Sequence, residues 1–236
     1  MRKKENKYNK LSKNKIMKNK FHISVFFLSL IGLIKIWHAI FIEKSQYILD
    51  FDVYFNSLMT NLHTSEKINQ FFIFITHLFD PKIFLLWFFF LLGILLWNKK
   101  KYEAMFLFFG VAGSQTIKIV MKWMTDRSRP ENPFDLYVHE SSFPSGHATT
   151  AIFIAIAIAY LFTKKLSKYK KLMLNAGLLA IALLVSFSRI FTQVHYFSDV
   201  ATGIILAVGS FSFTVLFFTF LHLKYKNTSF YSKIFN

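Results

Sequence analysis

The stretch Phe143–His147 (FPSGH) joins a polar loop to the apolar run over residues 148–163. A helix that begins in such a turn favours oxyanion binding, because its first free N–H groups point outward with the positive end of the helix dipole. We expect Ser145 to cap this helix and Gly146 to let the backbone approach a ligand closely. His147 would add a proton donor at the same helix end.

The chain around this turn is strongly apolar. Of its 236 residues 54% are hydrophobic and 31 are Phe, which exceeds what the core of a soluble protein of this length needs. Long apolar runs predict an all-α, polytopic membrane protein. We predict a bundle of six transmembrane helices, with an additional interfacial helix over 66–79. This helix ends before Asp80-Pro81, where Asp80 should cap the span that follows. The polar and mixed segment 43–69 should form an external loop with a short helix. The predicted spans cover approximately residues 21–42, 82–97, 102–121, 147–163, 172–187 and 200–221.

The net charge of +17 is distributed in clusters that flank the apolar runs. We predict a basic cytoplasmic arm (1–20), a membrane domain (21–223) and a basic cytoplasmic tail (224–236). With six spans, these clusters and the basic turns at 98–101 and 164–171 lie on one side, as the positive-inside rule requires. The polar loops would then be extracytoplasmic. The absence of a continuous basic face argues against nucleic-acid binding, and the absence of cysteine excludes disulfides and thiolate metal sites.

Three polar clusters should meet on the extracytoplasmic side. They are Lys122 with Arg129-Pro130, the turn that contains Ser145, Gly146 and His147, and Ser188-Arg189 with His195 and Asp199. Three cations beside a helix N-terminus suit a phosphoryl group. Two histidines can divide the roles of nucleophile and general acid, and a carboxylate four residues from an imidazole can orient it.

The polar residues around these clusters fall into two groups, one expected inside the bundle and one expected in solvent. Gln115, Lys118 and Lys122 share one helical face, which should point into the bundle toward the site. Asp126, Arg127 and Glu140 are expected to be solvated loop residues. No set of acids or histidines has metal-ligand spacing, so we expect neither a metal nor another cofactor.

The three clusters resemble the signature of the type 2 phosphatidic acid phosphatase family, membrane lipid phosphatases related to vanadium haloperoxidases. That signature reads Lys-x6-Arg-Pro, Pro-Ser-Gly-His and Ser-Arg-x5-His-x3-Asp, and every motif position is matched. The resemblance implies a metal-independent reaction through a phosphohistidine. In this reaction His195 attacks phosphorus, Asp199 orients it and His147 protonates the leaving group. The implied phosphate-binding residues are Lys122, Arg129, Ser145, Gly146 and Arg189.

The expected partners are the lipid bilayer and a lipid phosphate. By resemblance the substrate is undecaprenyl pyrophosphate, phosphatidylglycerol phosphate or phosphatidic acid. The alternatives are a lipid phosphotransferase of the same fold and an inactive lipid-binding or transport protein. A vanadium haloperoxidase is disfavoured because the resemblance associates that chemistry with a soluble scaffold, whereas this chain is predicted to span the membrane. The sequence indicates no oligomeric state.

Overall fold

The structure, a computed structural model, describes residues 2–136 and 140–225, with side chains from residue 19 onward. This part of the chain is helical without strands, which confirms the all-α class. Its helices are α1 (Arg2–Phe41), α2 (Gln46–Leu62), α3 (Glu66–His77), α4 (Pro81–Trp97), α5 (Lys101–Thr125), α6 (Gly146–Phe162), α7 (Lys168–Phe191) and α8 (Phe197–Tyr225).

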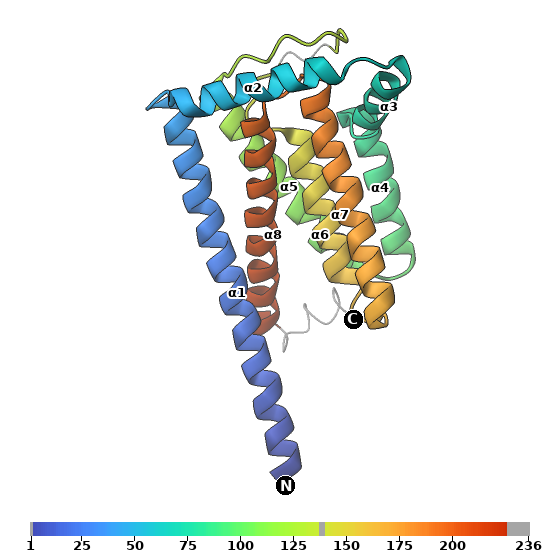
Figure 1. Cartoon of the computed structure of the whole chain (residues 1–236). Helices are drawn as coiled ribbons and strands as arrows, with labels where there is room; N and C mark the ends of the chain where they lie inside the picture. The colour runs from blue at the N-terminus through green and yellow to red at the C-terminus, as the bar shows by residue number, and fades with distance from the viewer. Residues whose placement is uncertain (1, 137–139, 226–236) are drawn as a thin grey trace.

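The long helices run side by side, and α2 lies across one end of the bundle (Figure 1). The segment before α3 was expected to be a loop with a short helix, but α2 occupies 17 residues of it. Asp52 and Met59 face inward from α2 and are buried, whereas Tyr47 and Tyr54 are exposed. This helix therefore covers the end of the bundle at which the predicted site lies.

By length and composition, α1 (from Asn19), α5, α7 and α8 can each cross a membrane. The pair α3 and α4 passes the same test together, with a bend of 54° between them. The predicted break at Asp80-Pro81 is therefore confirmed. Helix α6 is apolar but has only 17 residues, so it is shorter than the helices that qualify as candidate spans. The helices thus give four or five candidate spans, and the predicted count of six is not confirmed.

Several helices are longer than the sequence indicated. Helix α7 was expected over 172–187 but runs from Lys168 to Phe191, so it includes Arg189. The apolar pattern ends where the site begins, but the helical backbone continues. Polar site residues therefore lie on the last turn of α7 and the first turn of α8.

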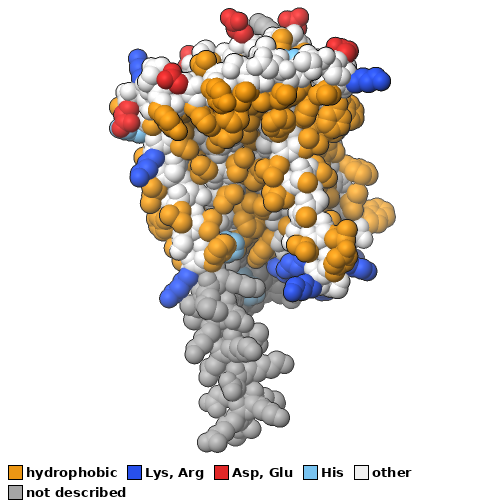
Figure 2. All heavy atoms as spheres, in the orientation of Figure 1, with side chains coloured by type: hydrophobic (Ala, Val, Ile, Leu, Met, Phe, Trp, Pro, Cys, Tyr) orange, Lys and Arg blue, Asp and Glu red, His pale blue; other side chains and the backbone are white. Residues whose placement is uncertain are grey.

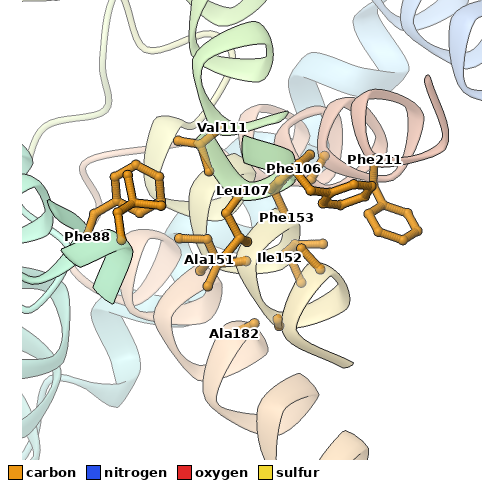
Figure 3. Packing of buried hydrophobic residues seen from close by; sticks show 14 of the residues in the cluster. Phe88, Phe106, Leu107, Val111, Ala151, Ile152, Phe153, Ala182 and Phe211 are labelled. Atoms are coloured by element: carbon orange, nitrogen blue, oxygen red, sulfur yellow. The ribbon is translucent and has the colours of Figure 1, made fainter. Parts of the chain in front are cut away.

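The core is centred on α6, which packs against α5, α7 and α8. Phe153 of α6 lies among side chains of these neighbours (Figure 3). A Cβ atom at Gly110 of α5 would lie 2.3 Å from the Phe153 ring, so the two helices approach closely because this position carries no side chain. This packing fixes the depth of α6 and hence the position of its N-terminal turn.

Hydrophobic side chains cover the middle of the bundle surface, and several Lys and Arg side chains gather at the end opposite α2 (Figure 2). That distribution is typical of a membrane protein. The predicted tail (224–236) lies outside the described residues except for Lys224 and Tyr225, which end α8.

Candidate active site

The three predicted clusters meet below α2. Lys122 lies on the last turns of α5, Arg189 on the last turn of α7 and Asp199 on the first turn of α8. Two contacts join the separate motifs directly. The backbone N–H of Ser145 donates to the carbonyl of Asp199 at 3.0 Å, and Arg129 Nη1 lies 3.3 Å from His195 Nε2.

The two ring nitrogens of His195 face different groups. Nδ1 lies 3.5 Å from Asp199 Oδ2, and Nε2 faces Arg129. The pKa of His195 is lowered well below 6.5, first by burial and then by the nearby cations of Arg129, Arg189 and Lys122. A neutral imidazole with its proton on Nδ1 satisfies both neighbours. Nε2 then carries the lone pair toward the cations.

The cations of the site are placed by backbone carbonyls. Arg129 donates from Nη1 to the carbonyl of Val194 at 2.6 Å and from Nε to that of Glu140 at 3.0 Å. Lys122 Nζ donates to the carbonyl of Ser141 and lies 3.7 Å from the exposed carboxylate of Glu140. These contacts hold the cations with few opposing charges. Burial lowers the pKa of Arg129, and the carboxylates of Asp199 and Glu140 offset only part of this effect.

Four buried side-chain atoms of the site make no hydrogen bond. They are Ser145 Oγ, His147 Nε2, Arg189 Nε and His195 Nδ1. A buried polar atom without a partner costs about 1–3 kcal/mol, and such atoms are few in native proteins. Two of them, His195 Nδ1 and His147 Nε2, lie 3.5 Å from the carboxylates of Asp199 and Asp80. Ser145 Oγ and Arg189 Nε are therefore the atoms left for a ligand that supplies oxygen atoms.

The prediction that Ser145 caps α6 is wrong for its side chain. Ser145 occupies the N-cap position, but its Oγ makes no capping hydrogen bond. Its carbonyl instead accepts bonds from the backbone and side chain of Thr149 at 3.1 and 2.9 Å. The hydroxyl group consequently stays available for a ligand. Gly146 begins the helix, and a Cβ atom there would lie 3.1 Å from the Lys118 side chain.

The predicted polar face of α5 does point into the bundle. Gln115 Nε2 donates to Thr150 Oγ1 of α6 at 2.8 Å, and Lys118 lies against Gly146. A cavity of about 550 Å³ opens beside Lys122 and is also lined by Ile119, Trp123, Asp126, Glu140 and Ser141. Because Trp123 and Ile119 are exposed on α5, this cavity lies between the Lys122 side chain and the apolar surface.

The bend between α3 and α4 supplies site residues that sequence reasoning missed. Thr76 Oγ1 accepts a 2.6 Å hydrogen bond from Arg189 Nη1. Asp80 Oδ1 lies 3.5 Å from His147 Nε2, and its Oδ2 accepts a 2.6 Å bond from His77 Nδ1. We expected Asp80 at the start of α4, but its side chain makes no capping bond. The only sequence signal was the break that Asp80-Pro81 makes in a long apolar run.

The expectation that Arg127 is a solvated residue is also wrong. Its side chain is 9% exposed and forms ion pairs with Asp199 and with Asp52 of α2. Asp52 was not singled out, because nothing in its neighbourhood in sequence marks it. Asp126 and Glu140 are exposed, as expected.

Side-chain cations, and not a set of metal ligands, dominate this site. Among the side chains that the structure describes, those of residues 19–136 and 140–225, no three of His, Asp or Glu come together as a metal-binding group would require. Lys122, Arg129 and Arg189 are the groups that could neutralise a bound phosphoryl group.

Comparisons with known proteins agree with this geometry. The family model described as PAP2 superfamily matches residues 103–224. A phosphatidylglycerophosphatase B of Bacillus subtilis (strain 168) is 34% identical over 116 residues, 47% of this chain. The chain spans 55% of that relative's length.

Two solved structures have the same fold. A transmembrane PAP2-type phosphatidylglycerolphosphate phosphatase from Bacillus subtilis superposes with a TM-score of 0.72 at 24% identity, covering 88% of this chain and 98% of that chain. Aquifex aeolicus LpxE superposes with a TM-score of 0.57 at 22% identity, covering 74% of this chain and 98% of that chain.

Proposed function

Because this chain belongs to the PAP2 superfamily, we propose that it is an integral membrane lipid phosphatase. It would hydrolyse a phosphomonoester or a pyrophosphate of a lipid through a phosphohistidine, without a metal. The observation that carries the proposal is the buried His195: its Nε2 faces Arg129, and burial and the neighbouring cations lower its pKa. A neutral imidazole lone pair among cations suits attack on a phosphoryl group whose charge those cations neutralise.

The reaction would proceed in two displacements. His195 Nε2 forms a bond to phosphorus, and the bond from phosphorus to the lipid oxygen breaks. With the anionic substrate bound and the Asp80 carboxylate 3.5 Å from its Nε2, His147 would carry a proton and give it to that oxygen. Asp199 would stabilise the positive charge that develops on His195. Water then attacks the phosphohistidine, His147 takes the water proton, and inorganic phosphate leaves with His195 restored.

The cations would act at the equatorial oxygens during both displacements. Arg129 approaches His195 from one side, while Arg189 is fixed by Thr76 on the other side of the site. Ser145 Oγ and the first N–H groups of α6 add neutral donors. Because these groups are held by backbone and buried contacts, they need little reorganisation when the transition state forms.

A lipid substrate is favoured by the place of the site within the bundle. The cavity beside Lys122 borders the exposed apolar residues Ile119 and Trp123, so an acyl or isoprenoid chain could lie along α5 while its phosphate enters. We infer a bundle of six spans that includes the short α6, with both termini cytoplasmic. The gathering of Lys and Arg opposite α2 supports an extracytoplasmic site (Figure 2).

For the substrate we favour undecaprenyl pyrophosphate or phosphatidylglycerol phosphate over phosphatidic acid. The Bacillus relatives are named for phosphatidylglycerophosphate, which supports the second of these candidates. All three lipids present a terminal phosphate to the same cations, so the choice requires measurement.

The test is phosphate release in detergent micelles from each of the three lipids and from a soluble phosphate ester. We expect release by the wild type and none above background by His195→Ala. Acid-labile phosphate should be trapped on the wild type only. Absence of release from every lipid by the folded wild type would refute the proposal, and transfer of phosphate to an acceptor other than water would indicate a phosphotransferase. Label retained on His195→Ala would refute its role as nucleophile.

A further inference from the structure

The guanidinium group of Arg127 lies between two buried carboxylates. Nη1 is 2.5 Å from Asp199 Oδ1, and Nη2 is 2.8 Å from Asp52 Oδ2. Asp52 is 1% exposed and Asp199 is completely buried. Burial acts to lower the pKa of Arg127, but Asp199 and Asp52 more than offset it, and the pKa is raised. The arginine is therefore a permanent cation shared by the two acids.

Asp52 anchors the beginning of α8 to α2. Its Oδ1 accepts the backbone N–H of Ser198 at 2.9 Å, and its Oδ2 accepts the Ser198 hydroxyl at 2.6 Å. Asn56 lies one turn after Asp52 on α2, and its carbonyl accepts a 2.7 Å hydrogen bond from Gln193 Nε2. Helix α2 thus holds the chain on both sides of His195.

The same contacts determine which carboxylate oxygen of Asp199 faces His195. Oδ1 is occupied by Arg127, and Oδ2 accepts the backbone N–H of Tyr196 at 3.0 Å. Oδ2 is also the oxygen that lies 3.5 Å from His195 Nδ1. Without Arg127, the two buried carboxylates would have no cation between them, and Asp199 would lose the contact that holds its Oδ1 away from His195.

Both guanidinium ends of Arg127 are used by carboxylates, and the Tyr196 ring covers it with the ring centre 4.3 Å away. Arg127 is consequently not placed to bind substrate, unlike Arg129, which faces His195. We propose that Arg127 and Asp52 form a positioning pair that holds Asp199 toward His195, and that α2 thereby supports catalysis without touching the substrate. This inference rests on the proposed phosphatase function.

A cavity of about 310 Å³ reaches this pair from outside and makes a sharp test possible. It is lined by Asp52, Arg127 and Tyr196, together with Ile40, Phe41, Lys44, Leu49, Val53 and Ser128. A small cation can enter a space of this size. In Arg127→Ala, added guanidinium should therefore occupy the place of the missing group.

The experiment measures kcat and KM for phosphate release by the purified full-length chain in detergent. We expect Arg127→Ala to lower kcat by about 10- to 100-fold, the range found for residues that orient metal-bound histidines without touching the metal, with KM unchanged. Guanidinium below denaturing concentrations should restore part of kcat, and urea, its neutral analogue, should not. Asp52→Asn should lower kcat less, and the control Asp50→Asn, on the exposed side of α2, should leave it unchanged.

Several outcomes would overturn the inference. An increase in KM with kcat intact would mean that Arg127 binds substrate, and equal rescue by urea would mean that it only fills space. If Arg127→Ala does not fold, Asp52→Asn decides: a loss of kcat with an unchanged melting temperature supports the pair, and an unchanged kcat refutes it. Failure of the wild type to release phosphate would instead overturn the proposed function, so the two failures are distinguishable.

Discussion

The close contact between α8 and the turn before α6 predicts a strong effect of one added methyl group. Gly203 lies on α8 one turn after Asp199, and a Cβ atom there would lie 2.6 Å from the backbone oxygen of Ser145. Thr149 Oγ1 would be 3.1 Å away. The Ser145 oxygen cannot rotate away, because it belongs to the backbone and accepts two bonds from Thr149. Gly203→Ala must therefore move α8 and the turn apart.

The size of the effect follows from the distances. An ordinary van der Waals contact requires about 3.4 Å, so the 2.6 Å approach demands a displacement of about 0.8 Å. Overpacking of this kind costs about 1–3 kcal/mol, of which the better helix propensity of alanine returns about 0.5–1 kcal/mol. We expect a net loss of stability on the order of 1 kcal/mol. The catalytic effect should be larger, because misplacing reacting groups by about 1 Å can cost about 100-fold in rate.

The assay compares phosphate release and the melting temperature of Gly203→Ala with those of Gly93→Ala and Gly177→Ala. At these two control positions a Cβ atom would meet nothing within 4 Å. Both controls should keep wild-type kcat and equal or exceed the wild type in stability. If Gly203→Ala behaves like the controls, the contact between α8 and the Ser145 turn does not set the geometry of the site.

Two further predictions concern the chemistry. Because Lys122, Arg129 and Arg189 supply the positive charge, activity should survive EDTA, measured as phosphate release before and after chelation. Because burial and neighbouring cations lower the pKa of His195, the nucleophile stays neutral as the pH falls below 6.5, and kcat/KM should decline only at lower pH. Arg129→Gln removes the nearest cation, so it should raise this pKa and move the acid limb of its pH profile upward.

Each of these predictions has a contradicting result. Loss of activity in EDTA that added magnesium restores would refute the metal-independent mechanism. An acid limb that Arg129→Gln leaves in place with the same substrate would refute a cation-lowered pKa of His195. Because both proteins are assayed with one substrate, ionisation of the substrate phosphate contributes equally to both pH profiles and does not affect their difference.

The sequence predicted the helical class from its apolar runs, and it predicted that the three motifs meet because the predicted topology places their loops on one side of the membrane. Apolar runs indicated the helices, and the spacing of His195 and Asp199 placed an acid near an imidazole that it does face. Helix ends were predicted less well, since Arg189 and Asp199 interrupt the apolar pattern while remaining helical. The count of six spans depends on α6, whose length alone does not decide whether it crosses a membrane.

The contacts around the motifs could not be predicted, because they join segments that are distant in sequence. Arg127 looked like a loop cation, and only the folded chain brings Asp52 to within 2.8 Å of it. Asp80 was interpreted as the residue that starts α4, since a residue before proline often does so. Its position beside His147 follows from the bend between α3 and α4, which the sequence marks as a break but not as an angle.

Three site residues that the sequence did not reveal lie outside the segment that matches the family. The match to the PAP2 superfamily begins at residue 103, whereas Asp52, Thr76 and Asp80 precede it and contact Arg127, Arg189 and His147. Removing one partner of a buried charge is strongly destabilising. Residues 103–224 therefore contain the motif residues but not all the side chains that contact and orient them. In this chain the helices from α2 to the start of α4 complete the site, so the arrangement of the motif residues depends on a part of the sequence in which no motif is visible.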